Sequence, residues 1–231
     1  MSKYGLLGYP LGHTMSPPIH KRLFELDGKA DTEYEVCEFA PEILADKIEY
    51  LNSLGGYNIT IPYKVEIINH IDGLDESAKR YNSVNCVAVK DGRRIGFNTD
   101  CYGFLRSLEA GGAKLDGKVL QIGCGGVGRM MAIETALSGG HLTIAALKSD
   151  EALAQQAVQE ILEKKPDADV RIVLSSGALC KEDFGDSMPQ IDLIVNATPI
   201  GMSPKTDRMP CSPEILDGVK FVFDAVYNPR E

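Results

Sequence analysis

The stretch Lys118-Val119-Leu120-Gln121-Ile122-Gly123-Cys124-Gly125-Gly126-Val127-Gly128 decides the fold of the second half of this chain. Its first five residues predict a short buried strand, and apolar residues at helical spacing follow the glycines up to Leu137. Glycines between a strand and a helix permit a tight turn and a close approach of the backbone to a pyrophosphate, which the helix N-terminus attracts. A turn that binds nothing is the alternative interpretation. The residues that we expect to line a dinucleotide site are Gly123, Gly125, Gly126, Val127 and Gly128.

Strands and helices alternate along nearly the whole chain, a pattern typical of α/β proteins with a parallel sheet and helices on its faces. After the glycine loop, strands are expected at His141–Ala146, Val170–Leu174, Asp192–Asn196 and Phe221–Asp224. Together with the first strand they make five, which fits an incomplete doubly wound, Rossmann-like sheet. A helix from Asp100 ends at a glycine pair shortly before this part. We therefore expect two domains, an N-terminal α/β domain over residues 1–100 and the dinucleotide-binding domain over residues 101–231.

Composition excludes several classes of protein. The chain has 231 residues, of which 44% are apolar and 25% charged, as in an ordinary globular protein. Its net charge of −9 disfavours nucleic acid and anionic lipid as partners. No run approaches the roughly 18 apolar residues of a membrane span, so we expect a cytoplasmic protein. The six cysteines and four histidines lack metal-ligand spacing, which predicts reduced thiols and no metal site.

The residues after the second strand of the dinucleotide-binding domain bear on the choice of cofactor. NAD-binding proteins usually carry an acid there, about 20 residues beyond the glycine loop, that holds the ribose 2′-hydroxyl. This chain has Ala145-Ala146-Leu147-Lys148-Ser149 instead. Lys148 and Ser149 could contact a 2′-phosphate, which favours NADP and leaves NAD as the alternative. The alternative for Lys148 itself is a solvated surface lysine.

The segment Gly8–Pro17 places two hydroxyls, Thr14 and Ser16, at the start of a predicted helix. Hydroxyls and free backbone N–H groups at a helix start suit a carboxylate. The alternative is that Ser16 only caps its helix.

A second set of polar residues lies at or beside the ends of predicted strands in the N-terminal domain. Asn58 and Thr60 alternate on one side of an extended segment that ends at Lys64. Asn85 lies within an apolar run, and Asp100 follows the next strand. Such strand ends border the ligand cleft of open α/β sheets, so Lys64 and Asp100 are candidates for a proton-transfer pair. The alternative is that Lys64 and Asp100 have no catalytic role: each side chain is then solvated, or Asp100 is the N-cap of the helix that follows.

In these segments the chain resembles the shikimate dehydrogenase family. The similarity runs from Gly8 to Pro229 and depends on ordered motifs that together are specific. These motifs are Gly8–Pro17, Asn58–Lys64, Ser83–Cys86, Gly96–Gly103, Gly123–Gly128, Asn196–Met202 and Asp224–Pro229.

The resemblance implies reversible, NADP-dependent reduction of 3-dehydroshikimate to shikimate in aromatic amino-acid biosynthesis. It implies that Lys64 and Asp100 are the catalytic pair. The residues that it implies for substrate binding are Thr14 and Ser16 at the carboxylate, Asn58, Thr60, Asn85 and Asp100 around the ring hydroxyls, and Tyr227 from the second domain. The residues that it implies for the cofactor are Gly123 to Gly128 at the pyrophosphate, and Thr198 and Ala225 near the nicotinamide.

The chain departs from the family pattern at three places. Thr14 stands where a serine is more common, which leaves a quinate or mixed quinate/shikimate dehydrogenase as an alternative. Ala146-Leu147-Lys148 replaces the usual Asn-Arg-Thr and removes a bidentate phosphate partner. Members of the family continue beyond the position of Glu231 with a further strand and helices. We expect the dinucleotide-binding domain of this chain to lack these elements. A non-catalytic, ligand-binding relative of the same fold is therefore a third hypothesis. The expected partners of the protein are small molecules, and a homodimer is the alternative to a monomer.

Overall fold

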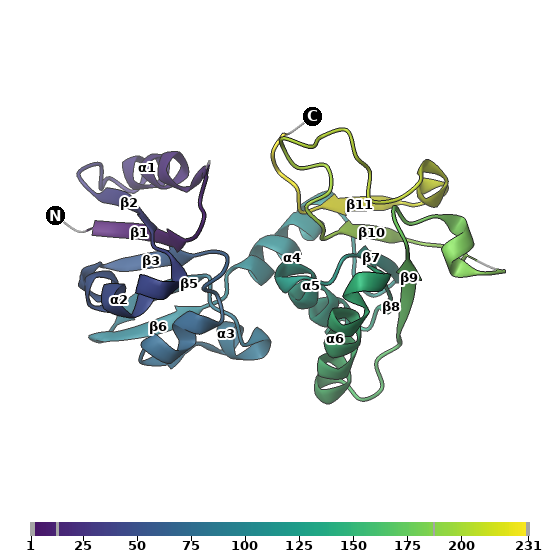
Figure 1. The fold of residues 1–231 in the computed structure, drawn as a ribbon, viewed down its shortest axis with the longest axis horizontal. Coiled ribbons are helices and arrows are strands. Elements are labelled where there is room, and N and C mark those ends of the chain that lie inside the picture. Colours follow the sequence, from purple (N-terminus) through teal and green to yellow (C-terminus); the bar gives the residue numbers. More distant parts are fainter. Residues whose placement is uncertain (1–2, 13, 187, 230–231) are drawn as a thin grey trace. The chain divides into compact units, whose positions relative to one another are not determined.

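The computed structural model describes residues 3–12, 14–186 and 188–229. The chain folds into two compact units, Met1–Asp100 and Cys101–Glu231, and each unit is built on one sheet (Figure 1). His13, in the motif Gly8–Pro17, lies outside the described residues. No helix among the described residues has the length and apolar character needed to cross a membrane.

The first unit has a six-stranded sheet in the order β2-β1-β3-β5-β6-β4. Its strands are β1 (Lys3–Gly8), β2 (Glu33–Glu38), β3 (Gly56–Ile59), β4 (Gly73–Leu74), β5 (Cys86–Lys90) and β6 (Arg93–Phe97). Its helices are α1 (Ser16–Leu26), α2 (Leu44–Ser53) and α3 (Glu76–Tyr81). The expectation of a parallel sheet is wrong for this unit, because β5 runs antiparallel to both β3 and β6.

A tight hairpin explains the antiparallel pair. Asp91 and Gly92 connect β5 to β6, and both have positive φ angles, 51° and 74°. Asp-Gly is the preferred pair for a two-residue turn in which both φ angles are positive, and its twist matches that of the flanking strands. The dipeptide was therefore a local signal for a hairpin.

The segment between β3 and α3 is anchored in the core of the first unit. Tyr63 and Ile67 are completely buried and belong to the same apolar cluster as Leu7, Leu51 and Val87. The segment also includes a 3₁₀ turn, Glu66–His70. Because residues on both sides of position 64 are fixed in the core, the backbone that carries Lys64 is held firmly.

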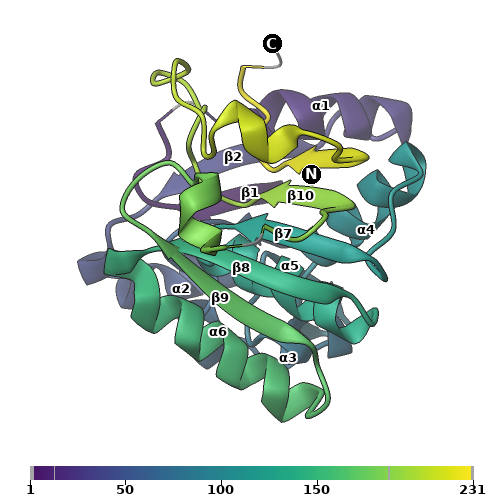
Figure 2. The same cartoon turned by 90° about the vertical axis from the view of Figure 1, so that its right-hand side faces the viewer.

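The second unit has a fully parallel sheet in the order β11-β10-β7-β8-β9. Its strands are β7 (Lys118–Ile122), β8 (His141–Leu147), β9 (Val170–Ser175), β10 (Leu193–Asn196) and β11 (Phe221–Asp224), and its helices are α4 (Asp100–Gly111), α5 (Gly126–Leu137) and α6 (Glu151–Lys164). Figure 2 shows β10, β7, β8 and β9 side by side in this order. Numbered from β7, the order is that of a doubly wound sheet, and it reverses between β7 and β10. The predicted α/β fold class is confirmed.

Candidate active site

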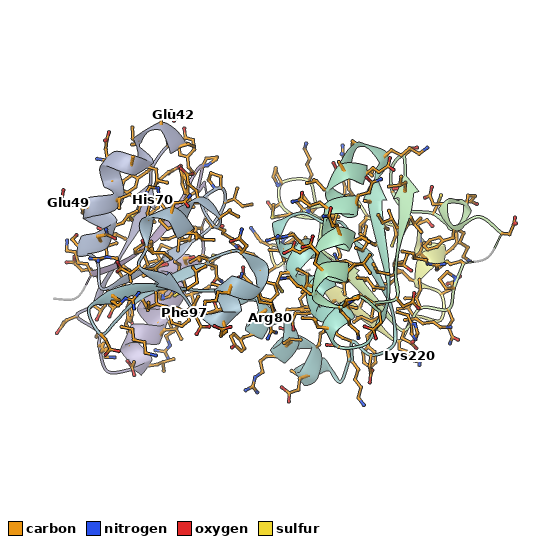
Figure 3. The ribbon with its side chains drawn as sticks, turned by 90° about the horizontal axis from the view of Figure 1, so that it is seen from below. Glu42, Glu49, His70, Arg80, Phe97 and Lys220 are labelled. Atoms are coloured by element: carbon orange, nitrogen blue, oxygen red, sulfur yellow. The ribbon has the colours of Figure 1, made fainter. Side chains whose placement is uncertain are left out.

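Backbone hydrogen bonds bring three segments of the first unit to one end of its sheet. The N–H of Ile59 donates to the carbonyl of Asn85 at 2.8 Å. The N–H of Asn85 donates to the carbonyl of Phe97, the last residue of β6 (Figure 3), at 2.9 Å. The N–H of Val84 donates to the carbonyl of Lys64 at 2.7 Å. The polar residues that follow β3, precede β5 and follow β6 are therefore neighbours.

Lys64 and Asp100 form an ion pair within this cluster, although they are 36 residues apart in the sequence. The Lys64 Nζ lies 2.7 Å from the Asp100 Oδ2, and the two side chains are 23% and 32% exposed. The other carboxylate oxygen, Oδ1, accepts a hydrogen bond from Asn85 Nδ2 at 2.7 Å. In turn, Asn85 Oδ1 accepts the N–H of Thr99 at 2.8 Å. The carboxylate is thus oriented by one cation and one amide.

Asp100 does not cap its helix, so the alternative role weighed from the sequence is wrong. It begins α4, and its N–H donates to Asn98 Oδ1 at 3.1 Å. Asn98 is 2% exposed, and its Nδ2 donates to the carbonyl of Ser83 at 3.1 Å. The Asp100 carboxylate instead binds Lys64 and Asn85.

Thr14 and Ser16 lie together at the start of α1, but Ser16 does not cap that helix either. The helix begins at Ser16, and the N-cap position is Met15, whose side chain makes no capping bond. The N–H of Ser16 donates to Thr14 Oγ1 at 3.2 Å. The capping role considered for Ser16 is therefore wrong, because Ser16 is already the first residue of the helix and the N-cap position belongs to Met15.

Tyr34 and His20, which no sequence pattern singled out, contact two of the predicted residues, Asn58 and Ser16. The Tyr34 hydroxyl donates to Asn58 Oδ1 at 2.9 Å and interacts with Ser16. The His20 ring stacks on the Tyr34 ring at a centroid distance of 4.1 Å. Burial raises the pKa of Tyr34 and lowers the pKa of His20. No local motif marks these residues, because strand register alone places Tyr34 of β2 and Asn58 of β3 on either side of β1.

The lowered pKa of His20 predicts a pH-dependent stability. Its folded pKa lies below the unfolded value of about 6.5, so the unfolded state binds the proton more tightly. Neutral His20 therefore makes its full contribution to the free energy of unfolding above about pH 6.5, and this contribution declines as the pH falls below that value. We expect the melting temperature to fall between about pH 7 and 5, and His20→Gln to reduce this decline. His70→Gln, which removes a histidine from the same unit, is the control. A decline that is unchanged in His20→Gln contradicts the prediction.

The glycine loop of the second unit has two closely packed positions and two open ones. Gly123 has a φ of +91°, and a Cβ on Gly128 would lie 2.7 Å from the carbonyl oxygen of Gly123. A Cβ on Gly125 or Gly126 would meet nothing within 4 Å. The outer glycines therefore close the turn and pack the helix on the strand, while the middle glycines leave their surface free for a ligand.

Gln121 holds the two ends of the loop together. This side chain is completely buried, and its Nε2 donates to the carbonyls of Gly123 and Gly128, both at 2.8 Å. The sequence analysis missed this role. A glutamine within the otherwise apolar strand β7 was the available signal, because a buried amide must find hydrogen-bond partners.

Thr198 and Ala225 lie at the carboxyl ends of β10 and β11, next to the glycine loop. A Cβ on Gly123 would lie 2.6 Å from Thr198 Cγ2. Asn196 Oδ1 accepts the Thr198 hydroxyl at 2.7 Å, and Asn196 Nδ2 donates to Asp224 Oδ1 at 2.9 Å. The Asn196 carbonyl accepts the N–H of Ala225 at 3.0 Å. Asn196 and Asp224 were not singled out from the sequence, yet they fix the geometry at the point where the strand order reverses.

The remaining predicted residues lie on the surface of the second unit. Tyr227 is 68% exposed. Lys148 is exposed and follows β8, and its side-chain amine makes no hydrogen bond or ion pair with the residues that the structure describes. Ser149 Oγ lies 3.4 Å from Asp150 Oδ1. The N–H of Gly123 donates to the carbonyl of Ala145 at 2.8 Å, so the loop and the end of β8 are joined.

The cysteines show no pairing that would suggest redox or metal chemistry. All six are free thiols, as predicted, and burial raises the pKa of Cys37 to about 12. Within residues 3–12, 14–186 and 188–229, no three His, Cys, Asp or Glu side chains gather as a metal site would require.

A doubly wound parallel sheet with a glycine loop where its strand order reverses defines the class of dinucleotide-binding α/β proteins. Residues 6–87 match the family model of the shikimate dehydrogenase substrate binding domain. A shikimate dehydrogenase (NADP⁺) of Caldanaerobacter subterraneus subsp. tengcongensis is 32% identical over 99% of this chain and 79% of its own length. The chain therefore belongs to the shikimate dehydrogenase family, and the resemblance inferred from its motifs is confirmed.

Solved structures support the same assignment. The shikimate 5-dehydrogenase of Listeria monocytogenes, in complex with shikimate and NAD, has a TM-score of 0.85 and 29% identity; the match covers 100% of this chain and 80% of that one. The quinate dehydrogenase of Corynebacterium glutamicum, in complex with NAD, has a TM-score of 0.81 and 32% identity, over 99% and 81% of the two chains.

Proposed function

We propose that this protein catalyses the reversible, NADP-dependent reduction of 3-dehydroshikimate to shikimate. The observation that carries the proposal is the Lys64–Asp100 ion pair, which Asn85 holds at one end of the first sheet. Membership of the shikimate dehydrogenase family supports it, because the relatives are named as NADP⁺-dependent enzymes.

Lys64 and Asp100 have the chemistry that carbonyl reduction needs. The bound nicotinamide would supply the hydride, and the protein must then protonate the oxygen that becomes an alkoxide. The Lys64 ammonium can donate a hydrogen bond to the carbonyl oxygen and then give up its proton, while Asp100 orients the amine. In the reverse direction the neutral amine takes the hydroxyl proton. Partial burial of the pair strengthens its electrostatic interactions.

The substrate roles assigned to the other polar residues are part of the proposal. The hydroxyls of Thr14 and Ser16 would hold the carboxylate, and Asn58, Thr60 and Asn85 would surround the ring hydroxyls. Thr60 supports this assignment, because its hydroxyl makes no hydrogen bond with the residues that the structure describes. Tyr227, which is exposed, is the remaining residue assigned to the substrate. Polar groups that a bound substrate buries discriminate strongly against analogues that lack a hydroxyl, because those groups are then left unpaired.

The second unit would hold the cofactor, and the first unit would hold the substrate. The glycine loop would bind the pyrophosphate, and Thr198 and Ala225 would lie on the nicotinamide side. Lys148, which has no partner among the described residues, would contact the 2′-phosphate together with Ser149. NAD stays the alternative cofactor, since two of the similar structures are complexes with NAD.

Steady-state kinetics test the proposed function. We expect the purified protein with shikimate and NADP to generate reduced nicotinamide, seen as a rise in its absorbance. Calorimetric titration with NADP and with NAD measures the cofactor preference separately. If the folded protein binds both ligands and shows no turnover with either cofactor, the proposal fails and the non-catalytic relative is favoured.

Quinate is the second candidate substrate. The similarity to a quinate dehydrogenase favours it, as does the methyl group of Thr14 beside the expected carboxylate site. The ratio of kcat/KM values for shikimate and quinate decides between them.

A further inference from the structure

A cavity of about 200 Å³ lies in the second unit, at the end of the sheet opposite to the glycine loop. It is lined by the first residues of β7 and β8, Lys118 and His141, and by Arg171 near the start of β9. The glycine loop and Lys148 follow the carboxyl ends of β7 and β8 instead. Because parallel strands carry their amino and carboxyl ends on opposite edges of a sheet, this cavity is separate from the proposed dinucleotide site.

The cavity is lined by polar and apolar residues, and its apolar side is formed by Leu120, Phe184 and Ile191. Strand register places Leu120, Thr143 and Arg171 side by side across β7, β8 and β9. Leu120 is 1% exposed, and the facing segment contributes the buried Ile191 and the half-buried Phe184. The cavity is smaller than the pockets of about 300–1,000 Å³ that usually hold ligands, so it suits a small molecule with an apolar body.

Arg171, an exposed residue, has an oriented guanidinium at this cavity. Its Nε donates to Thr143 Oγ1 at 2.9 Å, and Thr143 is itself buried. Its two Nη groups make no hydrogen bond or ion pair with the residues that the structure describes. By contrast, Arg129 of the same unit is paired with Glu160 at 2.7 Å. Arg171 therefore has free donors in a planar fork, held in place through a buried hydroxyl.

The other charges around the cavity leave it electropositive. The Asp169 carboxylate contacts His141: its Oδ2 lies 2.6 Å from the His141 Nδ1. The nearby Asp192 accepts the Lys118 backbone N–H at 2.9 Å and pairs with Lys220 at 2.7 Å. The two remaining cations on the lining, Lys118 and Arg171, have no ion-pair partner in the described part of the chain.

We propose that this cavity binds a small organic monocarboxylate. The apolar body of the ligand would lie between Leu120 and Phe184, and its carboxylate would accept two parallel hydrogen bonds from the Arg171 guanidinium. An arginine fork matches a carboxylate in this bidentate geometry. The apolar side of the cavity, with Leu120, Phe184 and Ile191, favours an organic anion over inorganic phosphate, which has no apolar body to bury there. The proposal does not depend on the proposed reaction, because none of these residues belongs to that site.

Titration of the full chain with benzoate tests the proposal, with backbone amide chemical shifts as the readout. We expect shifts at the amides of Thr143, Arg171 and Phe184 and none at the glycine loop, in the presence or absence of saturating NADP. Benzyl alcohol and benzylamine, which keep the ring and lack the anion, are expected to bind at least about tenfold more weakly.

Variants of Arg171 locate the carboxylate. Arg171→Gln is expected to weaken benzoate binding about tenfold or more, because a hydrogen bond to a charged group is lost. Arg171→Lys keeps the positive charge but lacks the planar pair of N–H donors, so we expect an intermediate affinity for benzoate. This variant replaces Arg171→Gln in the test if Arg171→Gln folds poorly. Arg106→Gln removes an exposed arginine of the same unit and is the matched control. Benzoate binding that is absent, unchanged in both Arg171 variants, displaced by NADP or matched by benzyl alcohol overturns the proposal.

Discussion

Replacing Lys64 with alanine is expected to lower kcat by about 10²–10⁴-fold, the usual contribution of a positioned proton donor. The amine is the only cation bound to the Asp100 carboxylate among the described residues, and its loss removes both the hydrogen bond to the carbonyl oxygen and the proton. The KM for shikimate should change less, because the hydroxyl and amide groups around the ring remain. A loss confined to kcat indicates an interaction made in the transition state.

Lys79→Ala is the matched control for this experiment. Lys79 lies in the same unit and also forms an ion pair at 2.7 Å, with Glu76, but its side chain is 56% exposed. Such a surface pair contributes little to stability, so this variant should keep its activity. Shikimate binding measured by calorimetry shows whether the Lys64→Ala site is intact. Turnover that survives in Lys64→Ala, or falls equally in both variants, refutes the assignment of Lys64.

Gly128→Ala is expected to damage both the stability of the second unit and its use of NADP. The new Cβ would lie 2.7 Å from the carbonyl oxygen of Gly123, a backbone atom that cannot move without distorting the loop. Overpacking of this kind costs about 1–3 kcal/mol in the free energy of unfolding. A shift of the loop by a fraction of an ångström misplaces the cofactor, and kcat/KM is expected to fall by about a hundredfold.

The chain offers a helical glycine without this constraint. Gly103, within α4, has nothing within 4 Å of its Cβ position, so Gly103→Ala should stabilise the protein by up to about 1 kcal/mol. Urea unfolding of both variants measures the difference, and NADP titration measures the affinity. If Gly128→Ala unfolds at the same urea concentration as the wild type and binds NADP equally well, the close packing at Gly128 determines neither stability nor NADP binding, and the prediction is wrong.

The elements that were predicted best are those encoded by adjacent residues. The strand at Lys118–Ile122, the helix at Gly126–Leu137 and the last strand at Phe221–Asp224 have the predicted bounds. Each has a clear local pattern, either an apolar run or apolar residues at helical spacing next to glycines. The Asp91-Gly92 hairpin is a local signal of the same kind, and overlooking it led to the wrong prediction of a parallel sheet in the first unit.

The roles that were missed or wrong depend on residues that are distant in the sequence. Ser16 was expected to cap its helix, but Thr14 accepts its N–H, and the Ser16 side chain interacts with Tyr34 of β2 instead. The alternative role for Asp100 fails in a similar way, because α4 begins at Asp100 itself and the carboxylate binds Lys64 and Asn85. Capping preferences describe what a residue can do locally. Which partner it finally binds depends on the neighbours that the sheet supplies.

The sequence by itself determined the family, the α/β class and the glycine loop, because periodicity and turn chemistry are properties of contiguous residues. It also supplied the candidates Lys64 and Asp100, through motifs in a fixed order. Only the tertiary structure decided that these two side chains meet at 2.7 Å, that Gln121 joins the ends of the loop, and that Tyr34 reaches Asn58. Strand register and buried hydrogen bonds fix those contacts, and both depend on segments that come together only when the chain folds.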